Sequence, residues 1–223
     1  MAEEENEAAT GFGRARRLMV EEQIAQRGLR DPRLLAVFEK VPRHIFVPDE
    51  YRDAAYSDGP LPIGFGQTIS QPYIVALMTS LLELTGDERV LEVGTGSGYQ
   101  AAILSYLAGE VYTIELIPDL MARAATRFRE LAIANLHCQV GDGSLGWLAG
   151  APYRGIIVTA AAREIPKSLL GQLTDGGRLV LPVETNHLQV LEVWMRHGSG
   201  FARRTIAHVA FVHLRGKYGW SAS

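Results

Sequence analysis

The chain has 223 residues, a length that suits one α/β domain with modest extensions. A domain of this size buries roughly 70% of the surface that its unfolded chain exposes, so it needs no disulfide or metal to stabilise it. The formal net charge of −3 differs from the strongly basic balance of proteins that coat nucleic-acid phosphates, and we expect no nucleic-acid partner. No apolar run approaches the ~18 residues of a membrane span, so we expect a soluble, cytoplasmic protein.

The N-terminal part of the chain predicts an acidic tail followed by two helices. Residues 1–13 should form a disordered tail, since they lack the pattern of a signal peptide and are rich in acidic residues. The first helix is predicted over Arg14–Arg27, with Gly28 at its C-terminal cap. A second helix begins after Asp31, a good N-cap that precedes a proline.

A glycine- and proline-rich segment follows these helices. Residues 43–48 predict an extended stretch, and Asp58–Gln67 predicts a loop. A structureless loop of this length is uncommon unless it binds something, which indicates a substrate loop. We therefore divide a single domain, residues 14–223, into N-terminal helices with a substrate loop (14–69) and a cofactor-binding core (70–223).

The core alternates strands with helices. A helix should run from Ser70 to about Leu84. The predicted strands are Arg89–Val93, Val111–Glu115, Leu136–Val140, Gly155–Thr159 and Arg178–Pro182, and the predicted helices between them are Tyr99–Leu107, Pro118–Ala134 and Ile165–Leu173. This alternation predicts a parallel sheet with helices on both faces. Val190–Met195 and Thr205–Leu214 predict an antiparallel strand pair at the C-terminus.

The strongest local motif is Val90-Leu-Glu-Val-Gly-Thr-Gly-Ser-Gly98, an apolar strand that leads into glycines at alternate positions and then a helix. Glycine lets the backbone turn sharply and approach a ligand closely. A nicotinamide-binding loop would carry glycine or alanine at position 99, where this chain has Tyr99. Alternate glycines after an acid, Glu92, are typical of enzymes that use S-adenosylmethionine. The motif therefore favours that cofactor, contacted by Glu92, Gly94, Gly96 and Gly98.

Two further motifs follow the next two strands. Glu115 ends the second strand, 21 positions after Gly94, where a carboxylate can accept both ribose hydroxyls of an adenosine. The alternative is an exposed acid at a strand end. Asp142 and Gly143 follow the third strand, where they could meet the adenine edge, although Asp-Gly is also a common turn pair.

Several segments together resemble the protein-L-isoaspartate(D-aspartate) O-methyltransferase family. The resemblance covers nearly the whole chain, from about Arg17 to Gly216. The most specific segment is Gly66-Gln-Thr-Ile-Ser-Gln-Pro-Tyr73, and the others are Val41–Pro48, Tyr56–Gly64, Glu164–Pro166 and Gly176–Val183. The resemblance implies a Rossmann-like S-adenosylmethionine-dependent methyltransferase fold, mostly parallel, with an antiparallel C-terminal strand pair and an N-terminal helical extension.

The same resemblance assigns roles to the segment before the core. It implies that Gln67, Thr68 and Ile69 lie beside the cofactor and that Ser70, also near the cofactor, is the active-site residue. Physical chemistry alone offers another interpretation of Ser70, as the N-cap of the following helix. On the substrate side we expect Pro62, Ile63, Gly64 and His208, although core or surface placement is an alternative for this histidine.

The chain departs from the family pattern at three places. Arg163 stands where members often carry a proline, Arg154 and Gly155 replace the usual Asp-Ala, and Glu184 replaces a glycine. These changes bear on substrate affinity and loop shape more than on cofactor use. Cys138 is expected to be a buried thiol on a strand, and the histidines show no metal-binding spacing, so we expect no metal.

The resemblance implies transfer of a methyl group from S-adenosylmethionine to the free α-carboxylate of L-isoaspartyl residues in damaged proteins and peptides. The ester would then collapse to a succinimide, which initiates repair. That carboxylate is ionised at neutral pH and needs no general base. Two alternatives remain: a methyltransferase for a small molecule or RNA, and a non-catalytic cofactor-binding module. We expect a monomer.

Overall fold

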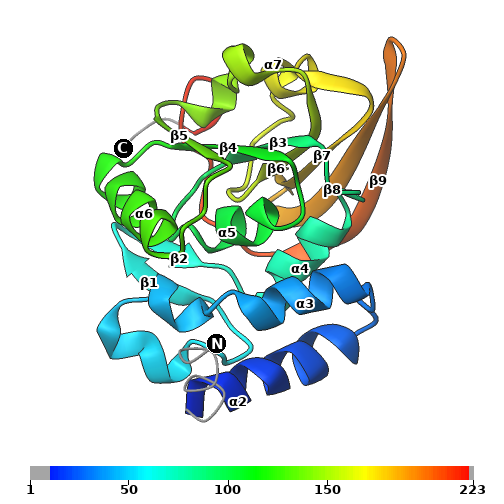
Figure 1. The fold of residues 1–223 in the computed structure, drawn as a ribbon. Coiled ribbons are helices and arrows are strands. Elements are labelled where there is room, and N and C mark those ends of the chain that lie inside the picture. The colour runs from blue at the N-terminus through cyan, green and yellow to red at the C-terminus, as the bar shows by residue number, and fades with distance from the viewer. Residues whose placement is uncertain (1–10, 221–223) are drawn as a thin grey trace.

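The centre of the structure is a seven-stranded sheet in which one strand runs antiparallel to the other six. The computed structural model describes residues 11–220. Across the sheet the strands are β5 (Leu136–Val140), β4 (Glu110–Glu115), β3 (Arg89–Val93), β6 (Tyr153–Val158), β7 (Leu173–Thr185), β8 (Leu188–His197) and β9 (Gly200–Val209). The first five are parallel, and β8 runs antiparallel to both β7 and β9. The predicted fold class is confirmed (Figure 1).

The strand order places a switch point between β3 and β6, at the carboxyl ends of the strands. From β3 the chain proceeds outward through β4 to β5, then returns to the other side of β3 through β6. Neighbouring loops at the carboxyl ends of β3 and β6 therefore diverge toward opposite faces. Open α/β sheets bind ligands in the crevice at such a switch point.

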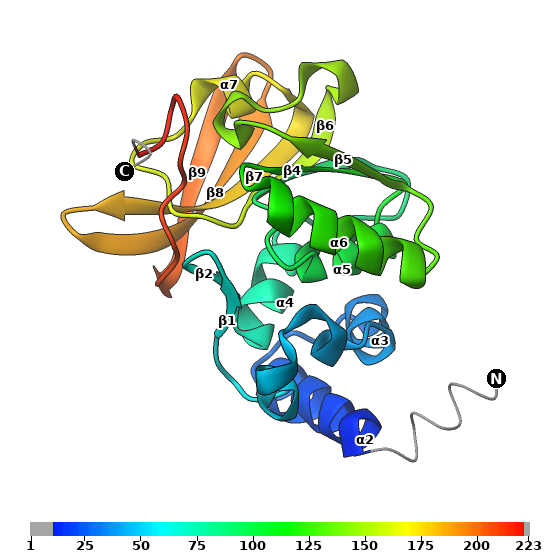
Figure 2. The same ribbon diagram turned by 90° about the vertical axis from the view of Figure 1, so that its left-hand side faces the viewer.

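Helices cover both faces of the sheet. On one face lie α4 (Pro72–Ser80), α5 (Tyr99–Ser105) and α6 (Pro118–Glu130), and on the other lies α7 (Lys167–Leu170) (Figures 1 and 2). Successive side chains of β3 point to opposite faces of the sheet. Val90 packs on the face covered by α4, and Leu91 and Val93 pack on the face covered by α7.

Several predicted element bounds and the predicted burial of Cys138 were wrong. β9 ends at Val209 rather than at Leu214, because β8 begins at Leu188 and leaves later residues without a partner strand. The helix predicted over 165–173 has only four residues, and the helix predicted over 70–84 begins at Pro72 and ends at Ser80. Cys138 is exposed because β5 is an edge strand, and partial desolvation raises the pKa of its thiol.

The N-terminal helices pack beneath α4. The first consists of α2 (Gly11–Leu18) and a π-helical continuation, Met19–Ala25, so it begins before the predicted Arg14, and the tail prediction for residues 1–10 lies outside the described residues. α3 (Pro32–Lys40) starts where predicted, with the Asp31 carboxylate accepting from the Arg33 N–H at 2.9 Å. Residues 43–46 form a 3₁₀ turn rather than an extended stretch.

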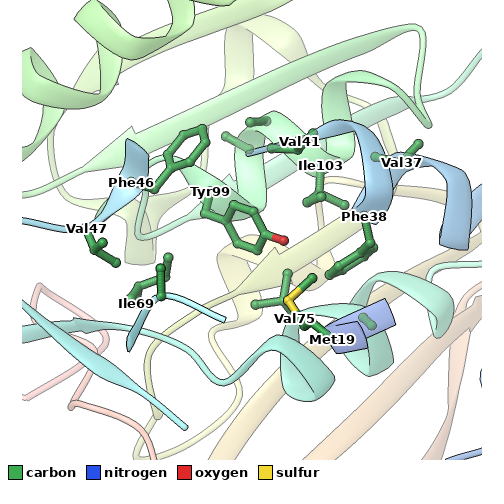
Figure 3. Packing of buried hydrophobic residues seen from close by; sticks show 14 of the residues in the cluster. Met19, Val37, Phe38, Val41, Phe46, Val47, Ile69, Val75, Tyr99 and Ile103 are labelled. Carbon is green, nitrogen blue, oxygen red and sulfur yellow. The ribbon is translucent and has the colours of Figure 1, made fainter. Parts of the chain in front are cut away.

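Tyr99 joins this N-terminal layer to the glycine-rich loop. It is the first residue of α5, and its buried ring meets Phe38 and Phe46 edge-on, with centroids 6.1 and 5.4 Å away (Figure 3). Met19, Val75 and Ile103 line the same cluster. A bulky aromatic ring at this position therefore fixes the N-terminal extension against the core.

The predicted substrate loop contains a small hairpin. β1 (Leu61–Gly64) pairs antiparallel with β2 (Gln67–Ile69), so the prediction of a structureless loop was wrong. The turn is possible because Gly64 and Gly66 take φ of +90° and +68°, a region that most side chains avoid. This hairpin leads directly into Ser70 and α4.

Candidate active site

A single pocket collects most of the residues that the sequence singled out. It opens at the carboxyl ends of β3, β4 and β6 and is closed on its outer side by β2 and by the segment after β9. Its lining comprises residues 67–70, Val75, Met78, residues 93–97, Tyr99, Gln100, residues 114–117, Gly143, Thr159, Ala160 and residues 211–215. Figure 2 shows the C-terminal segment passing beside the β1–β2 hairpin.

The glycine-rich loop forms the floor of the pocket. Gly94 has a φ of +96°, and a Cβ there would collide with the Thr159 hydroxyl, which donates to the Gly94 carbonyl at 2.6 Å. Gly96 has a φ of +52° and also lines the pocket. Gly98 does not line it: a Cβ there would stand 2.9 Å from the Phe128 ring, so this glycine permits α5 to pack on α6.

Glu115 is held at the end of β4 by the loop itself. Its Oε2 accepts from the Gly96 N–H at 2.7 Å, and its Oε1 accepts from the Ile117 N–H at 3.0 Å. The side chain is 7% exposed and faces the pocket. Each carboxylate oxygen retains a lone pair, so the fixed carboxylate can accept a pair of ligand hydroxyls.

Glu92 lies beneath the floor and not on it. The side chain is fully buried in β3, absent from the pocket lining, and accepts a hydrogen bond from the Thr113 hydroxyl. Burial, and after it the nearby charge of Glu115, raises the pKa of Glu92 to about 8. Alternation along β3 places this side chain on the helix-covered face that it shares with Val90, outside the pocket lining, and its contact with the cofactor stays a prediction.

Asp142 is hydrogen-bonded to the C-terminal segment of the chain. Its Oδ1 accepts from the Ser144 N–H and hydroxyl at 2.9 and 2.7 Å, and its Oδ2 accepts from the Lys217 N–H at 2.7 Å. The carboxylate thus ties the C-terminal segment to the loop after β5 instead of lining the pocket. Gly143 does line it, and a Cβ there would stand 2.5 Å from Val93.

Ser70 faces the pocket from the opposite side. It does not cap α4, because the N-cap residue is Gln71, so the capping interpretation was wrong. No hydrogen bond of the Ser70 hydroxyl is formed within residues 11–220, while its carbonyl accepts from Arg43 Nη2 at 2.7 Å. Arg43 is fully buried, and burial lowers its pKa to about 10. The hydroxyl is therefore available to a ligand, on a backbone held by a buried guanidinium.

The comparisons with known proteins agree with this geometry. The family model for protein-L-isoaspartate(D-aspartate) O-methyltransferase matches residues 14–219. The chain belongs to this family. Among its relatives, the protein-L-isoaspartate O-methyltransferase of Methanoregula boonei is 53% identical over 92% of this chain and 94% of its own length. The enzyme of the same name from Dictyoglomus turgidum is 52% identical over 89% and 90%.

Solved structures of this methyltransferase family share the fold. One protein-L-isoaspartate O-methyltransferase matches with a TM-score of 0.84 and 26% identity, over 91% of this chain and 67% of that one. A Plasmodium falciparum protein described as a putative protein-L-isoaspartate O-methyltransferase, in complex with S-adenosyl-L-homocysteine, matches with a TM-score of 0.78 and 23% identity, over 90% and 98%.

The residues that we expected on the substrate side stay predictions, and they lie beside the pocket rather than in its lining. Pro62, Ile63 and Gly64 belong to β1, which pairs with β2, and Ile63 Cδ1 lies 3.5 Å from where a Cβ of Gly96 would stand. His208 also lies outside it, exposed on β9, because the chain reaches the pocket only after that strand has ended.

The residues that reach the pocket there, Phe211–Arg215, were missed from the sequence. Their strand-like pattern suggested a continuation of β9. Thr159 and Ala160 were missed too, although their place just after a predicted parallel strand is a usable signal. The methyltransferase pocket is thus assembled from six segments, and the sequence singled out residues in four of them.

No three His, Cys, Asp or Glu side chains within residues 11–220 gather closely enough to hold a metal ion. No helix in that range is long and apolar enough to cross a membrane.

Proposed function

We propose that this chain transfers the methyl group of S-adenosylmethionine to the free α-carboxylate of L-isoaspartyl residues in damaged proteins and peptides. Methylation of isoaspartyl residues is the function of its family, and the family match spans residues 14–219. The observation on this chain that best supports the proposal is one pocket. That pocket contains both the carboxylate of Glu115, fixed by backbone hydrogen bonds, and the hydroxyl of Ser70, which forms no hydrogen bond within residues 11–220. The first suits a cofactor and the second suits an acceptor.

The pocket fits an adenosyl cofactor on its inner side. Glu115 offers its carboxylate to the ribose hydroxyls, the backbone of Gly94 and Gly96 gives close approach without side chains, and Gly143 leaves room beside Val93. Gln67, Thr68 and Ile69 close the cofactor region from the outer side. These assignments rest on how the lining residues are placed in the pocket.

Methyl transfer to a carboxylate requires little acid–base catalysis from the protein. The bound cofactor supplies a methyl group that is already activated as a sulfonium. The acceptor carboxylate has a pKa of roughly 3.5 and is ionised at neutral pH, so no residue has to remove a proton. The protein must align the acceptor oxygen with the methyl group and desolvate it in part. In this proposal the Ser70 hydroxyl donates to that carboxylate, and Arg43 positions Ser70.

A pair of peptides tests the proposed activity. An isoaspartyl peptide and its aspartyl twin are incubated with labelled cofactor, and base-labile methyl ester is measured. We expect strong preference for the isoaspartyl peptide, since displacement of the acceptor by about 1 Å can cost ~100-fold in rate. Equal methylation of the two peptides would contradict the repair function and indicate a less selective methyltransferase. No ester on either peptide would contradict the activity altogether.

We further propose that the enzyme acts as a monomer in the cytoplasm. The cytoplasm is the usual place for this family. Light scattering at working concentration and cell fractionation test the two statements. A net charge of −3 supports protein and peptide substrates over nucleic acid.

A further inference from the structure

A second hollow adjoins the active-site pocket on its outer side. It lies between the tip of the β1–β2 hairpin, the loop after β6 and the C-terminal segment. Gln67, Val212, His213 and Arg215 line both spaces, so the hollow lies directly beside the pocket that Ser70 lines. A peptide chain that presents one residue to Ser70 can therefore extend into it.

The hollow carries positive charge that the protein does not neutralise. Arg163 and Arg215 both line it and are exposed, and neither forms an ion pair with a carboxylate of residues 11–220. His213 differs, because its Nε2 lies 2.9 Å from the Glu184 carboxylate, which compensates any charge on the ring. Glu164, next to Arg163 in sequence, does not line the hollow.

An aromatic residue holds one of these guanidinium groups in place. Arg163 lies over the Trp220 ring, with its Cζ 4.7 Å from the centroid, and the His213 ring stacks on the same indole at 4.3 Å. Stacking reduces the freedom of a long side chain before it binds anything. The arrangement presents a planar, preorganised donor group beside the methyl-transfer pocket.

We propose that Arg163 and Arg215 form a subsite for a carboxylate of the substrate peptide near the isoaspartyl residue. The proposal rests on the proposed function. Guanidinium groups match carboxylate geometry with paired hydrogen bonds. Because an extended chain advances about 3.3 Å per residue, a carboxylate within about three residues of the isoaspartyl position can reach the adjoining hollow. The carboxylate comes from an Asp or Glu side chain or from the C-terminus of a peptide.

Peptides that differ in one charge separate these sources. The parent is an isoaspartyl peptide with blocked ends and glutamine at the three positions on each side. In two series, Glu or Lys replaces Gln at one flanking position at a time, and a final peptide keeps Gln throughout but has a free C-terminal carboxylate. We expect Glu at the best position to lower KM by about 3- to 10-fold relative to Gln, with little change in kcat. A gain only with the free terminus assigns the subsite to chain ends.

Variants then assign the effect to the two arginines. Arg163→Gln and Arg215→Gln should each reduce the preference for Glu, and the double variant should abolish it. The matched control is Arg204→Gln, which removes an exposed arginine from β9 outside the hollow and should change nothing. Arg163→Glu should favour the Lys peptide over the Glu peptide.

Two results would overturn the subsite: no preference in the wild-type enzyme, or an unchanged preference in the double variant. The blocked Gln peptide keeps this question apart from the proposed function. If that peptide is methylated while Glu brings no gain, the subsite is wrong and the repair activity stands. If no isoaspartyl peptide is methylated, the proposed function itself is wrong.

Discussion

The two walls of the active-site pocket are built in different ways. The inner wall comes from the carboxyl ends of β3, β4 and β6, where sheet register places Gly94, Glu115 and Thr159 side by side. The outer wall comes from β2 and from Phe211–Arg215, segments some 140 residues apart that meet only in the folded chain. The difference suggests a division of labour: a rigid inner wall for the cofactor and an outer wall, less constrained by the sheet, for the substrate.

The largest expected effect is on the outer wall. Ser70→Ala removes the hydroxyl that we place against the acceptor carboxylate, and it should lower kcat on an isoaspartyl peptide by roughly 10- to 1,000-fold. Cofactor affinity should change much less. Steady-state kinetics together with calorimetry of cofactor binding measure both quantities.

Controls for Ser70 distinguish chemistry from stability. Because Gln71 and not Ser70 is the N-cap of α4, Ser70→Ala should change the free energy of unfolding by less than about 0.5 kcal/mol. Ser80→Ala makes the same change at the far end of α4, outside the active-site pocket, and should keep full turnover. Wild-type turnover in Ser70→Gly would show that the hydroxyl has no catalytic role.

The buried acid beneath the inner wall should make stability depend on pH. The folded pKa of Glu92, about 8, lies above its ordinary value of 4.5, so folding favours the protonated form. The stability from this group is complete below pH 4.5, declines as pH rises and is lost above about pH 8. Its loss should amount to on the order of 5 kcal/mol. Glu92→Gln should flatten this slope in urea unfolding at pH 5, 6.5 and 8.

A surface acid provides the comparison for Glu92. Glu110 lies half-exposed on β4, where Arg89 holds the pKa of its carboxyl below the ordinary value. Glu110→Gln should therefore leave the decline between pH 5 and 8 intact. A Glu92→Gln protein with the wild-type slope would show that another group titrates.

Cofactor affinity is the next smaller effect, and it belongs to the inner wall. Glu115→Ala should leave ribose hydroxyls unpaired and weaken binding by about 1–3 kcal/mol, roughly 5- to 150-fold. At saturating cofactor, kcat should stay within a few-fold of wild type. Glu110→Gln, a change on the same strand away from the pocket, is the control for calorimetry. Unchanged affinity in folded Glu115→Ala would contradict the ribose assignment.

The inner wall was largely predictable because its residues follow strands whose apolar patterns are strong. Gly94, Gly96 and Glu115 are all placed by that rule. Glu92 and Gly98 belong to the same motif but do not line the pocket, since a linear pattern does not tell which side of a strand or helix faces the ligand. Glu92 is buried and accepts a hydrogen bond from Thr113, and Gly98 permits α5 to pack on α6.

The outer wall was predictable only through family resemblance. Ser70 came from that resemblance, whereas local chemistry favoured a helix cap that the structure assigns to Gln71. Phe211–Arg215 have the alternating apolar pattern of a strand, and only the limited length of β8 ends the pairing at Val209. The end of β9 therefore depends on contact with β8, which the local sequence does not show. The hairpin around Gly64–Gly66 was not predicted, because its two strands have only four and three residues and show no clear alternating pattern.

Asp142 links the inner and outer walls of the pocket, so its removal should weaken cofactor binding and substrate binding, each by a small amount. Its carboxylate accepts from the Lys217 N–H and so fixes the C-terminal segment to the loop that carries Gly143. Asp142→Ala loses these charge-assisted hydrogen bonds on the rim, where water compensates in part. We expect KM for the peptide and Kd for the cofactor to rise together, each by about 5-fold. Kinetics and calorimetry on one preparation measure the pair.

A second carboxylate makes this last prediction specific. Asp175 Oδ1 accepts from the Gly198 N–H at 2.7 Å, the same kind of anchor, at the turn between β8 and β9 and outside the pocket. Asp175→Ala should lose similar stability while both constants stay at wild-type values. If Asp142→Ala raises only the cofactor Kd, the residue acts on the inner wall alone, as the sequence suggested. If it raises only KM, the C-terminal segment serves the substrate alone. A joint rise would show that Asp142 couples the two walls. Within residues 11–220, the side chains that hydrogen-bond the segment after Arg215 to the loop after β5 are those of Asp142 and Ser144, and Asp142 itself orients Ser144.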